Sequence, residues 1–178
     1  MTAREGTEGT ITHLGVTTFE VGSGASITLT KSVISVRDPI TGTNNPKSIP
    51  GAVMEYTITA TNTGPLPVDA NTVRISEQLP ADVLLVFGAP PNPIIFTQGA
   101  VSSGLNYSFV SLSDPADDIA FSNDGGATFV TPVVDPITGI DLTSPPINYL
   151  QIRPTGQFAA PGGGADPSFS ITLRVQIR

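Results

Sequence analysis

The feature that most constrains this chain is a strict alternation of apolar and polar residues in stretches bounded by glycine and proline. In the clearest stretch, residues 168–178, every second side chain is apolar. In another, residues 51–64, Met54, Tyr56 and Ile58 share one parity and threonines lie between them. A period of two indicates a strand with one face toward a core and the other toward water. Both stretches are therefore predicted to be half-buried antiparallel strands.

Glycine and proline interrupt the rest of the chain so often that no window of helical length remains. The 178 residues include 18 Gly and 17 Pro, and each proline removes a backbone donor. Thr, Ser, Val and Ile dominate the stretches between them, as is typical of strands. About ten strands are predicted, enough for an all-β fold of two packed antiparallel sheets, a β-sandwich.

The strand pattern also carries finer expectations. In residues 25–37 the apolar positions change parity after Val33, which predicts a bulge or a change of sheet near Ser32. The proline-rich stretch 88–93 predicts a stiff connection that protects a sheet edge. Further strands are expected at 71–77, 83–87, 94–97, 105–112, 119–122, 127–130 and 147–152.

Residues 1–24 differ from the rest and are predicted to be an N-terminal strand arm with a Gly/Ser hinge, joined to a β-sandwich domain of residues 25–178. The arm is polar as far as Gly9 and ends in Gly22-Ser23-Gly24. Its apolar side chains, the candidate donor-strand residues, are Ile11, Leu14, Val16, Phe19 and Val21. Two interpretations remain open, since such a strand pairs either within its own sandwich or with a neighbouring subunit.

A series of short motifs runs through the first half of the chain: Lys31-Ser32-Val33, Asp38-Pro39, Pro50-Gly51, residues 55–65 and Ile75-Ser76-Glu77-Gln78-Leu79-Pro80-Ala81. Together these motifs resemble a known family, the conserved-repeat module DUF11. The similarity covers roughly residues 26–87 and departs at Glu77, where that family more often has Asp. The resemblance implies an immunoglobulin-like β-sandwich at the surface of a bacterial or archaeal cell. It implies no catalytic residues.

Composition excludes several classes of partner. Charged residues make up 13% of the chain and the net charge is −7, so no basic stripe for nucleic acid and no polybasic patch for a membrane is expected. The chain has no cysteine for disulfides or thiolate metal sites. It also has no apolar run long enough to span a membrane. We therefore expect neither nucleic-acid binding nor membrane insertion.

One motif matches the Asp-box pattern, Ser-x-Asp-x-Gly-x-Thr followed by an aromatic residue. Its members are Ser122, Asp124, Gly126, Thr128 and Phe129. An Asp that accepts backbone N–H groups, with glycine supplying positive φ, predicts a tight hairpin. A single copy indicates a structural role.

Acidic residues crowd the same region. Asp114, Asp117, Asp118 and Asp124 could supply hard oxygen ligands to Ca²⁺, although their spacing does not match an EF-hand. The alternative is a solvated acidic loop, which the sequence favours. No other metal or cofactor is expected.

No catalytic site is predicted. His13, the sole histidine, lies in the arm. The glutamates are dispersed and mostly expected on outward faces: Glu5, Glu8, Glu20, Glu55 and Glu77. They form no evident carboxylate pair for acid–base work.

The sequence thus favours a structural subunit of an extracellular filament or surface layer, on the cell surface of a prokaryote. Its partners would be copies of itself, each donating its arm head-to-tail to a sheet edge of the next. The sequence does not fix which edge receives the arm, and the C-terminal strand is one candidate. A second hypothesis is a non-catalytic spacer or adhesion module of a larger surface protein. A carbohydrate-binding module ranks third, because the chain has no Trp and three Tyr for stacking on sugars.

Overall fold

The computed structural model describes residues 17–20, 25–88 and 92–178, and of residues 17–20 the backbone alone. Within these ranges the chain is all-β and contains no helix. The strands are β1 (Thr17–Glu20), β2 (Ile27–Arg37), β3 (Val53–Asn62), β4 (Arg74–Gln78), β5 (Val83–Val86), β6 (Ile95–Gln98), β7 (Leu105–Asn106), β8 (Ile119–Ser122), β9 (Tyr149–Ile152), β10 (Thr155–Gly156) and β11 (Ser168–Ile177). Every pair of these strands is antiparallel. The all-β prediction is confirmed.

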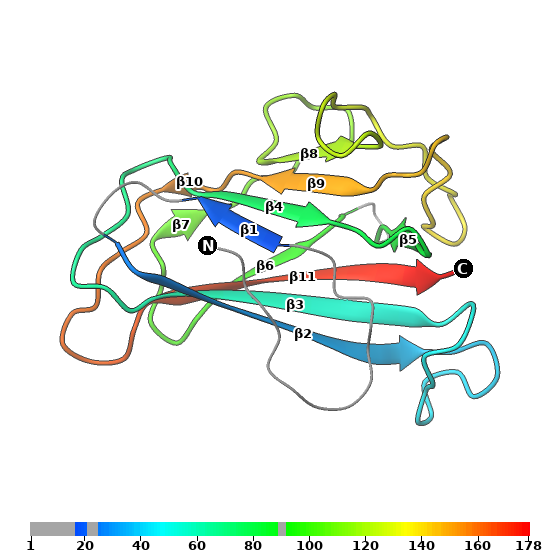
Figure 1. Cartoon of the computed structure of the whole chain (residues 1–178), viewed down its shortest axis with the longest axis horizontal. Coiled ribbons are helices and arrows are strands. Elements are labelled where there is room, and N and C mark those ends of the chain that lie inside the picture. Colours follow the sequence, from blue (N-terminus) through cyan, green and yellow to red (C-terminus); the bar gives the residue numbers. More distant parts are fainter. Residues whose placement is uncertain (1–16, 21–24, 89–91) are drawn as a thin grey trace.

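The strands form two larger sheets and one small one (Figure 1). The five-stranded sheet has the order β2-β3-β11-β5, with β6 also paired to β11. The four-stranded sheet has the order β1-β4-β9-β8, and β10 pairs with β7. Neighbours in a sheet are often far apart in sequence, so long-range contacts hold the chain together.

The two stretches with the strictest alternation lie side by side in the middle of the five-stranded sheet. β3 and β11 pair from Val53 opposite Gln176 to Thr61 opposite Ser168. Along both strands, alternate side chains are buried. The opposite face carries mainly Thr and Ser, whose hydroxyls remain solvated. The period of two therefore predicted which residues of these strands would be buried.

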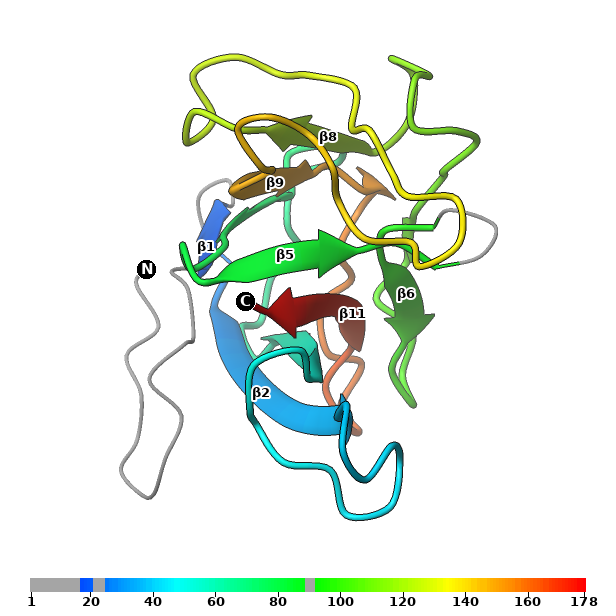
Figure 2. The same cartoon turned by 90° about the vertical axis from the view of Figure 1, so that its right-hand side faces the viewer.

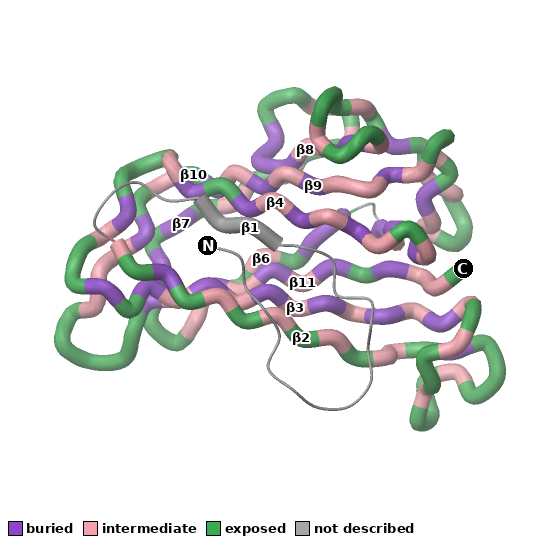
Figure 3. Tube along the Cα trace, in the orientation of Figure 1, coloured by how far each residue is buried: buried purple, intermediate pink, exposed green. Residues whose placement is uncertain are grey.

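A single hydrophobic cluster draws side chains from both larger sheets. Tyr56 and Leu173 come from the five-stranded sheet, and Ile75 and Leu150 from the four-stranded one. Buried segments alternate mainly with intermediate ones along the strands of both sheets (Figure 3). Each fully buried side chain of this size contributes about 2 kcal/mol to folding. This shared core fixes the two sheets relative to each other.

β5 and β6 behave as one interrupted strand along β11. Val86, at the end of β5, lies opposite Arg174. Ile95, at the start of β6, lies opposite Thr172. The chain therefore leaves β11 after Val86 and rejoins it two positions farther along. The intervening residues include the proline-rich connection expected from the sequence.

Three finer expectations are wrong. The strand expected at 105–112 is limited to β7, because carboxylates described below accept its backbone N–H groups. The segment 127–130 forms only a single bridge, from Val130 to Phe121. The irregularity of β2 lies between Ser35 and Arg37 rather than near Ser32, and β2 remains beside β3 throughout.

Candidate functional site

The N-terminal strand β1 lies at one edge of the four-stranded sheet. It pairs with β4, in register from Thr17 opposite Glu77 to Glu20 opposite Arg74. Of the predicted donor-strand residues, Phe19 lies in β1 with its backbone opposite Ile75. The others, Ile11, Leu14, Val16 and Val21, lie outside the described residues. In a single chain, residues 17–20 thus complete a sheet of their own domain.

The C-terminal strand offers no edge to a donated arm. β11 pairs with β3 along one side and with β5 and β6 along the other. The C-terminal strand, a candidate acceptor from the sequence, is therefore not an open edge. The edge of β4 takes its place as the candidate acceptor, because it is the edge on which the N-terminal strand lies. The domain boundary predicted at Gly24 stays a prediction, since residues 21–24 are not described.

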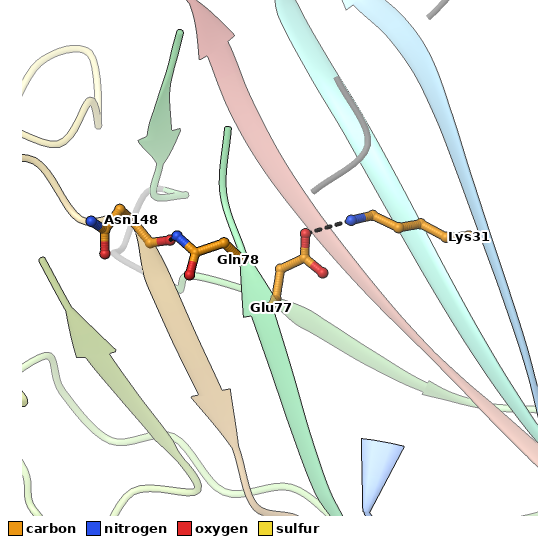
Figure 4. Close-up of polar contacts among 4 residues, drawn as sticks. All are labelled: Lys31, Glu77, Gln78 and Asn148. Atoms are coloured by element: carbon orange, nitrogen blue, oxygen red, sulfur yellow. Dashed lines mark hydrogen bonds and ion pairs between the residues drawn. The ribbon is translucent and has the colours of Figure 1, made fainter. Parts of the chain in front are cut away.

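An ion pair joins the two sheets next to this edge (Figure 4). Nζ of Lys31, on β2, lies 2.5 Å from Oε1 of Glu77, on β4. The side chains are only 10% and 1% exposed, respectively. Glu77 is thus an exception to the expectation that the glutamates mostly face outward. Its residue on β4 lies opposite Thr17 of β1, so the ion pair lies directly beside the N-terminal strand.

The aromatic ring of Tyr56 lies next to this ion pair. Lys31 Nζ lies 5.1 Å from the centre of the Tyr56 ring, on the face of which a cation is favourably placed. Burial, followed by the negative charges of Glu77 and Asp82, raises the pKa of Tyr56 to about 12. The phenol is thus neutral at physiological pH, and it supports the ion pair as a neutral aromatic surface.

The neighbouring residue Gln78 ties β4 to the next strand. Its Nε2 donates a hydrogen bond to the backbone oxygen of Asn148, at 2.7 Å, just before β9 (Figure 4). Glu77 and Gln78 therefore point to opposite sides of β4, one toward the five-stranded sheet and the other along its own sheet. Glu77 thus joins β4 to the facing sheet, and Gln78 joins it to the segment before β9, on the side away from β1.

The Asp-box residues form a compact hairpin after β8. Asp124 accepts hydrogen bonds from the Ser122 hydroxyl at 2.7 Å and from the Thr128 hydroxyl at 2.6 Å. These hydroxyls, Ser122 first, lower the pKa of Asp124 to about 2. Gly126 has a φ of 94°, and a Cβ there would lie 2.9 Å from the Tyr149 ring. Phe129 is half-exposed. The polar side chains of Ser122, Asp124 and Thr128 hydrogen-bond to one another within the hairpin.

The remaining calcium candidates hold the loop that replaces the expected strand. Asp117 accepts N–H groups of Val110 and Ser111, at 2.7 and 3.1 Å. Asp118 accepts the N–H group of Ser108 at 2.7 Å, and Asp114 accepts that of Ala116. In the part of the chain that is described, no three His, Cys, Asp or Glu side chains are grouped to hold a metal ion. The four aspartates are thus separate loop-closing acceptors, and His13 lies outside the described residues.

A pentapeptide that occurs twice, Asp-Pro-Ile-Thr-Gly, forms two closely similar turns. In residues 38–42, Asp38 Oδ1 accepts the N–H groups of Ile40 and Thr41. In residues 135–139, Asp135 Oδ1 accepts those of Ile137 and Thr138. These hydrogen bonds lower the pKa of both carboxyls, through the Thr41 hydroxyl foremost at Asp38 and the Thr138 N–H foremost at Asp135. Each turn therefore has a fixed shape.

Both turns hold their isoleucine in water. Ile40 is 80% exposed and Ile137 is 92% exposed. The second turn is the tip of a hairpin that docks on β5, since Asp141 N–H donates to Leu85 O and Phe87 N–H donates to Gly139 O. The repeated pentapeptide, with an apolar residue at its tip, is visible in the sequence. The sequence alone did not show that this isoleucine is exposed in both copies, which the structure does.

Beside the second turn lies an open depression of about 850 Å³. Its apolar lining comes from five separate parts of the chain and includes Val36, Val53, Val86, Leu112, Val134 and Ile137. Arg37 and Arg174 also line it, and Arg174 is paired with Glu55 at 2.8 Å. Thr43, the residue after the first turn, also lines the depression, but Ile40 does not.

Comparisons with known proteins give no relative: no family model, no curated protein and no solved structure matches the chain. Across the described residues, no helix is long and apolar enough to cross a membrane. The assignment of function therefore depends on the two surfaces described above, the β4 edge and the depression.

Proposed function

We propose that the protein is a non-catalytic structural subunit of an extracellular filament or surface layer of a prokaryote, whose copies join head-to-tail by donating the N-terminal strand. The observation that carries this proposal is the position of β1. The most N-terminal described strand lies at a sheet edge, four residues long, beside β4. A strand of this kind is well suited to exchange between copies.

The exchange requires no new type of interaction. Residues 17–20 of a neighbouring copy would meet β4 in the same register, with residue 17 opposite Glu77 and residue 20 opposite Arg74. Exchange of an identical element is a low-cost route to association, because the strand forms the same hydrogen bonds with the β4 of either copy. Since donor and acceptor are different surfaces, the contact is heterologous, and it propagates into an open fibre when its rotation does not close a ring.

The fold assignment belongs to the same proposal. Two antiparallel sheets that share one hydrophobic cluster support an immunoglobulin-like two-sheet sandwich of the DUF11 type. Glu77, where the resembling family more often has Asp, is an acidic residue facing Lys31 between the sheets. A carboxylate at that position is consistent with the resemblance. The resemblance in turn supports a location at the cell surface.

The exchange is tested by a pair of cysteines, Glu20→Cys with Arg74→Cys. These positions are register partners on adjacent strands, within the Cα separation that a disulfide spans, and Arg74 is exposed. The chain has no other cysteine. If β1 is exchanged, oxidation of the assembled protein gives a ladder of covalent multimers on a denaturing, non-reducing gel. If β1 stays on its own β4, the gel shows monomers.

The controls distinguish strand exchange from filament formation. Either cysteine alone can give no multimer beyond a dimer. Electron microscopy of the full chain beside a variant lacking residues 1–22 should show fibres in the first and none in the second. Fibres that yield only oxidised monomers would disprove strand exchange. Monomers in both preparations, with equal melting temperatures, would disprove the filament and favour the spacer or adhesion module.

A further inference from the structure

The hairpin of residues 133–142 holds three large apolar side chains in water. Val133 and Leu142 are each more than half exposed, and Ile137 is almost wholly exposed. Val133 and Leu142 lie side by side on the hairpin, since Leu142 N–H donates to Val133 O. Exposed aliphatic side chains contribute almost nothing to folding, because burial is the source of apolar stabilisation. Three of them on one short hairpin are typical of an interaction surface.

This hairpin is fixed in position before any partner arrives. Its backbone pairs with β5 and the residue after it, through Asp141 N–H to Leu85 O and Phe87 N–H to Gly139 O. Its tip is the capped turn of residues 135–139 described above. A surface that is already ordered loses little conformational entropy when it binds. The exposed apolar side chains are therefore presented by a preorganised element.

The depression beside the hairpin carries charges of both signs in its lining. Arg37 is exposed there, and in the part of the chain that the structure describes it forms no ion pair. Asp135 carries the opposite charge, because hydrogen bonds, the one from Thr138 N–H foremost, hold the pKa of its carboxyl below the ordinary value. Arg174 is already paired with Glu55. One cation and one anion thus remain for a partner.

We infer that this face pairs with the same face of a second copy about a two-fold axis, the hairpin of each copy lying over the depression of the other. A partner with charges of one sign would be attracted by Arg37 or Asp135 and repelled by the other. A second copy presents both groups, so Arg37 of each copy lies opposite Asp135 of the other. The aliphatic lining receives the apolar side chains of the partner's hairpin.

The charge of the whole chain favours this face over others for self-association. Copies with a net charge of −7 repel one another. At the depression, Arg37 balances Asp135 and Glu55 balances Arg174. Two acidic copies therefore meet where neither has an excess of negative charge.

The contact is separate from strand exchange. In Figure 2, β1 lies at one side of the molecule, and the yellow-to-gold segment that contains residues 133–142 lies at the opposite side. The β4 edge thus stays accessible in the pair, and within fibres the same contact would join neighbouring fibres laterally. An interface limited to one hairpin and one depression is small, so the pairing is expected to be weak and is best captured by crosslinking.

A single cysteine tests the two-fold contact. Ile137 belongs both to the hairpin tip and to the lining, so its two copies come close together, and the chain has no cysteine of its own. Full-length Ile137→Cys should therefore oxidise to a disulfide-linked dimer about tenfold faster than Ile40→Cys. This matched control changes the same pentapeptide at an exposed side chain outside the lining. Non-reducing gels measure both rates. The Asp135 hydrogen bonds persist, because they come from backbone N–H groups.

The charges provide a second test. Arg37→Glu, added to Ile137→Cys, places two like-charged pairs in each contact and should slow dimer formation about tenfold. Arg178→Glu makes the same change in net charge at an exposed residue outside the lining, and should alter the rate less than about twofold. Equal rates for the two cysteine variants, or equal effects of the two glutamate variants, would overturn the inference. The outcome is independent of strand exchange, because the Glu20→Cys and Arg74→Cys ladder reports only on β1 and β4.

Discussion

At Glu77 a carboxylate lies almost free of water between two sheets, and its attraction to Lys31 offsets the cost of removing both charges from solvent. A buried ion pair adds little stability compared with apolar residues, but removal of one partner leaves the other charge without compensation. Both groups lie beside β1, at the edge where a donated strand would pair. The main effect of this ion pair is therefore to align β2 with β4.

The variant Glu77→Ala should therefore destabilise the protein strongly, by about 3 kcal/mol. The double variant Lys31→Met with Glu77→Leu should recover most of this loss, because it removes both charges and keeps the volume filled. Urea unfolding, followed by tyrosine fluorescence or circular dichroism, measures both. If Glu77→Ala unfolds at the same urea concentration as the wild type, the pair does not hold the sheets.

Sequence reasoning missed this pair although the sequence contains its signal. On β2, Lys31 has the parity of Ile27 and Leu29, and on β4, Glu77 has the parity of Ile75. Charged residues on an apolar face were expected in water, where they are usually found. The two charges meet only because β2 and β4 face each other from different sheets. Alternation along one strand contains no information about which strand will face it.

At the scale of the elements, alternation predicted the strands whose ladder hydrogen bonds run from backbone to backbone without interruption. β3 and β11 lie within the ranges expected for them. It failed for residues 107–112, where alternation continues but the aspartates Asp117 and Asp118 accept the N–H groups that a neighbouring strand would need. A side chain that competes with the ladder is invisible to a period-two pattern.

The hairpin that ends in residues 135–139 depends on one glycine. Gly139 has a φ of +72°, and a Cβ there would approach the backbone oxygen of Phe87 far more closely than atoms can. Gly42, the equivalent residue of the first pentapeptide, has a φ of +65° and open space around it. Both would be strained by alanine, but only Gly139→Ala would also collide with the chain just after β5.

Gly139→Ala should consequently destabilise the protein more than Gly42→Ala, which should cost about 1 kcal/mol from backbone strain alone. Amide hydrogen exchange adds a local measurement. Protection of Asp141 and Phe87, whose N–H groups pair this hairpin with β5 and the residue after it, should fall in the Gly139 variant and persist in the other. Equal losses of stability would mean that the hairpin moves away from β5 at no cost.

On the scale of the whole molecule, the fold class was predictable and the depression was not. Gly, Pro and Thr/Val/Ile content is a local property, and it sufficed to predict an all-β chain. The depression arises where β2, β5 and the hairpin of residues 133–142 meet. Residues that are far apart in sequence meet there only because of strand order, which composition and periodicity do not specify.

The net charge of −7 predicts how assembly should respond to salt. Like-charged subunits repel one another, and salt screens this repulsion over about 10 Å at 0.1 M. If apolar and backbone contacts join the copies, fibres should form faster as NaCl rises from about 10 mM to about 150 mM, as followed by light scattering. The same series on Ile137→Asp serves as the control for added charge. Fibres that dissolve in salt would indicate ion pairs at the junction instead.

The interruption between β5 and β6 also makes this fold a candidate for carrying an inserted peptide or domain. Because the chain leaves β11 after Val86 and rejoins it at Ile95, both neighbouring segments keep their own register, whatever the length of the connection between them. Lengthening a surface connection costs little closure entropy, about 0.6 kcal/mol for each doubling. A foreign epitope or small domain inserted after Gly88 would thus be displayed once per subunit, at regular intervals along any fibre that the protein forms.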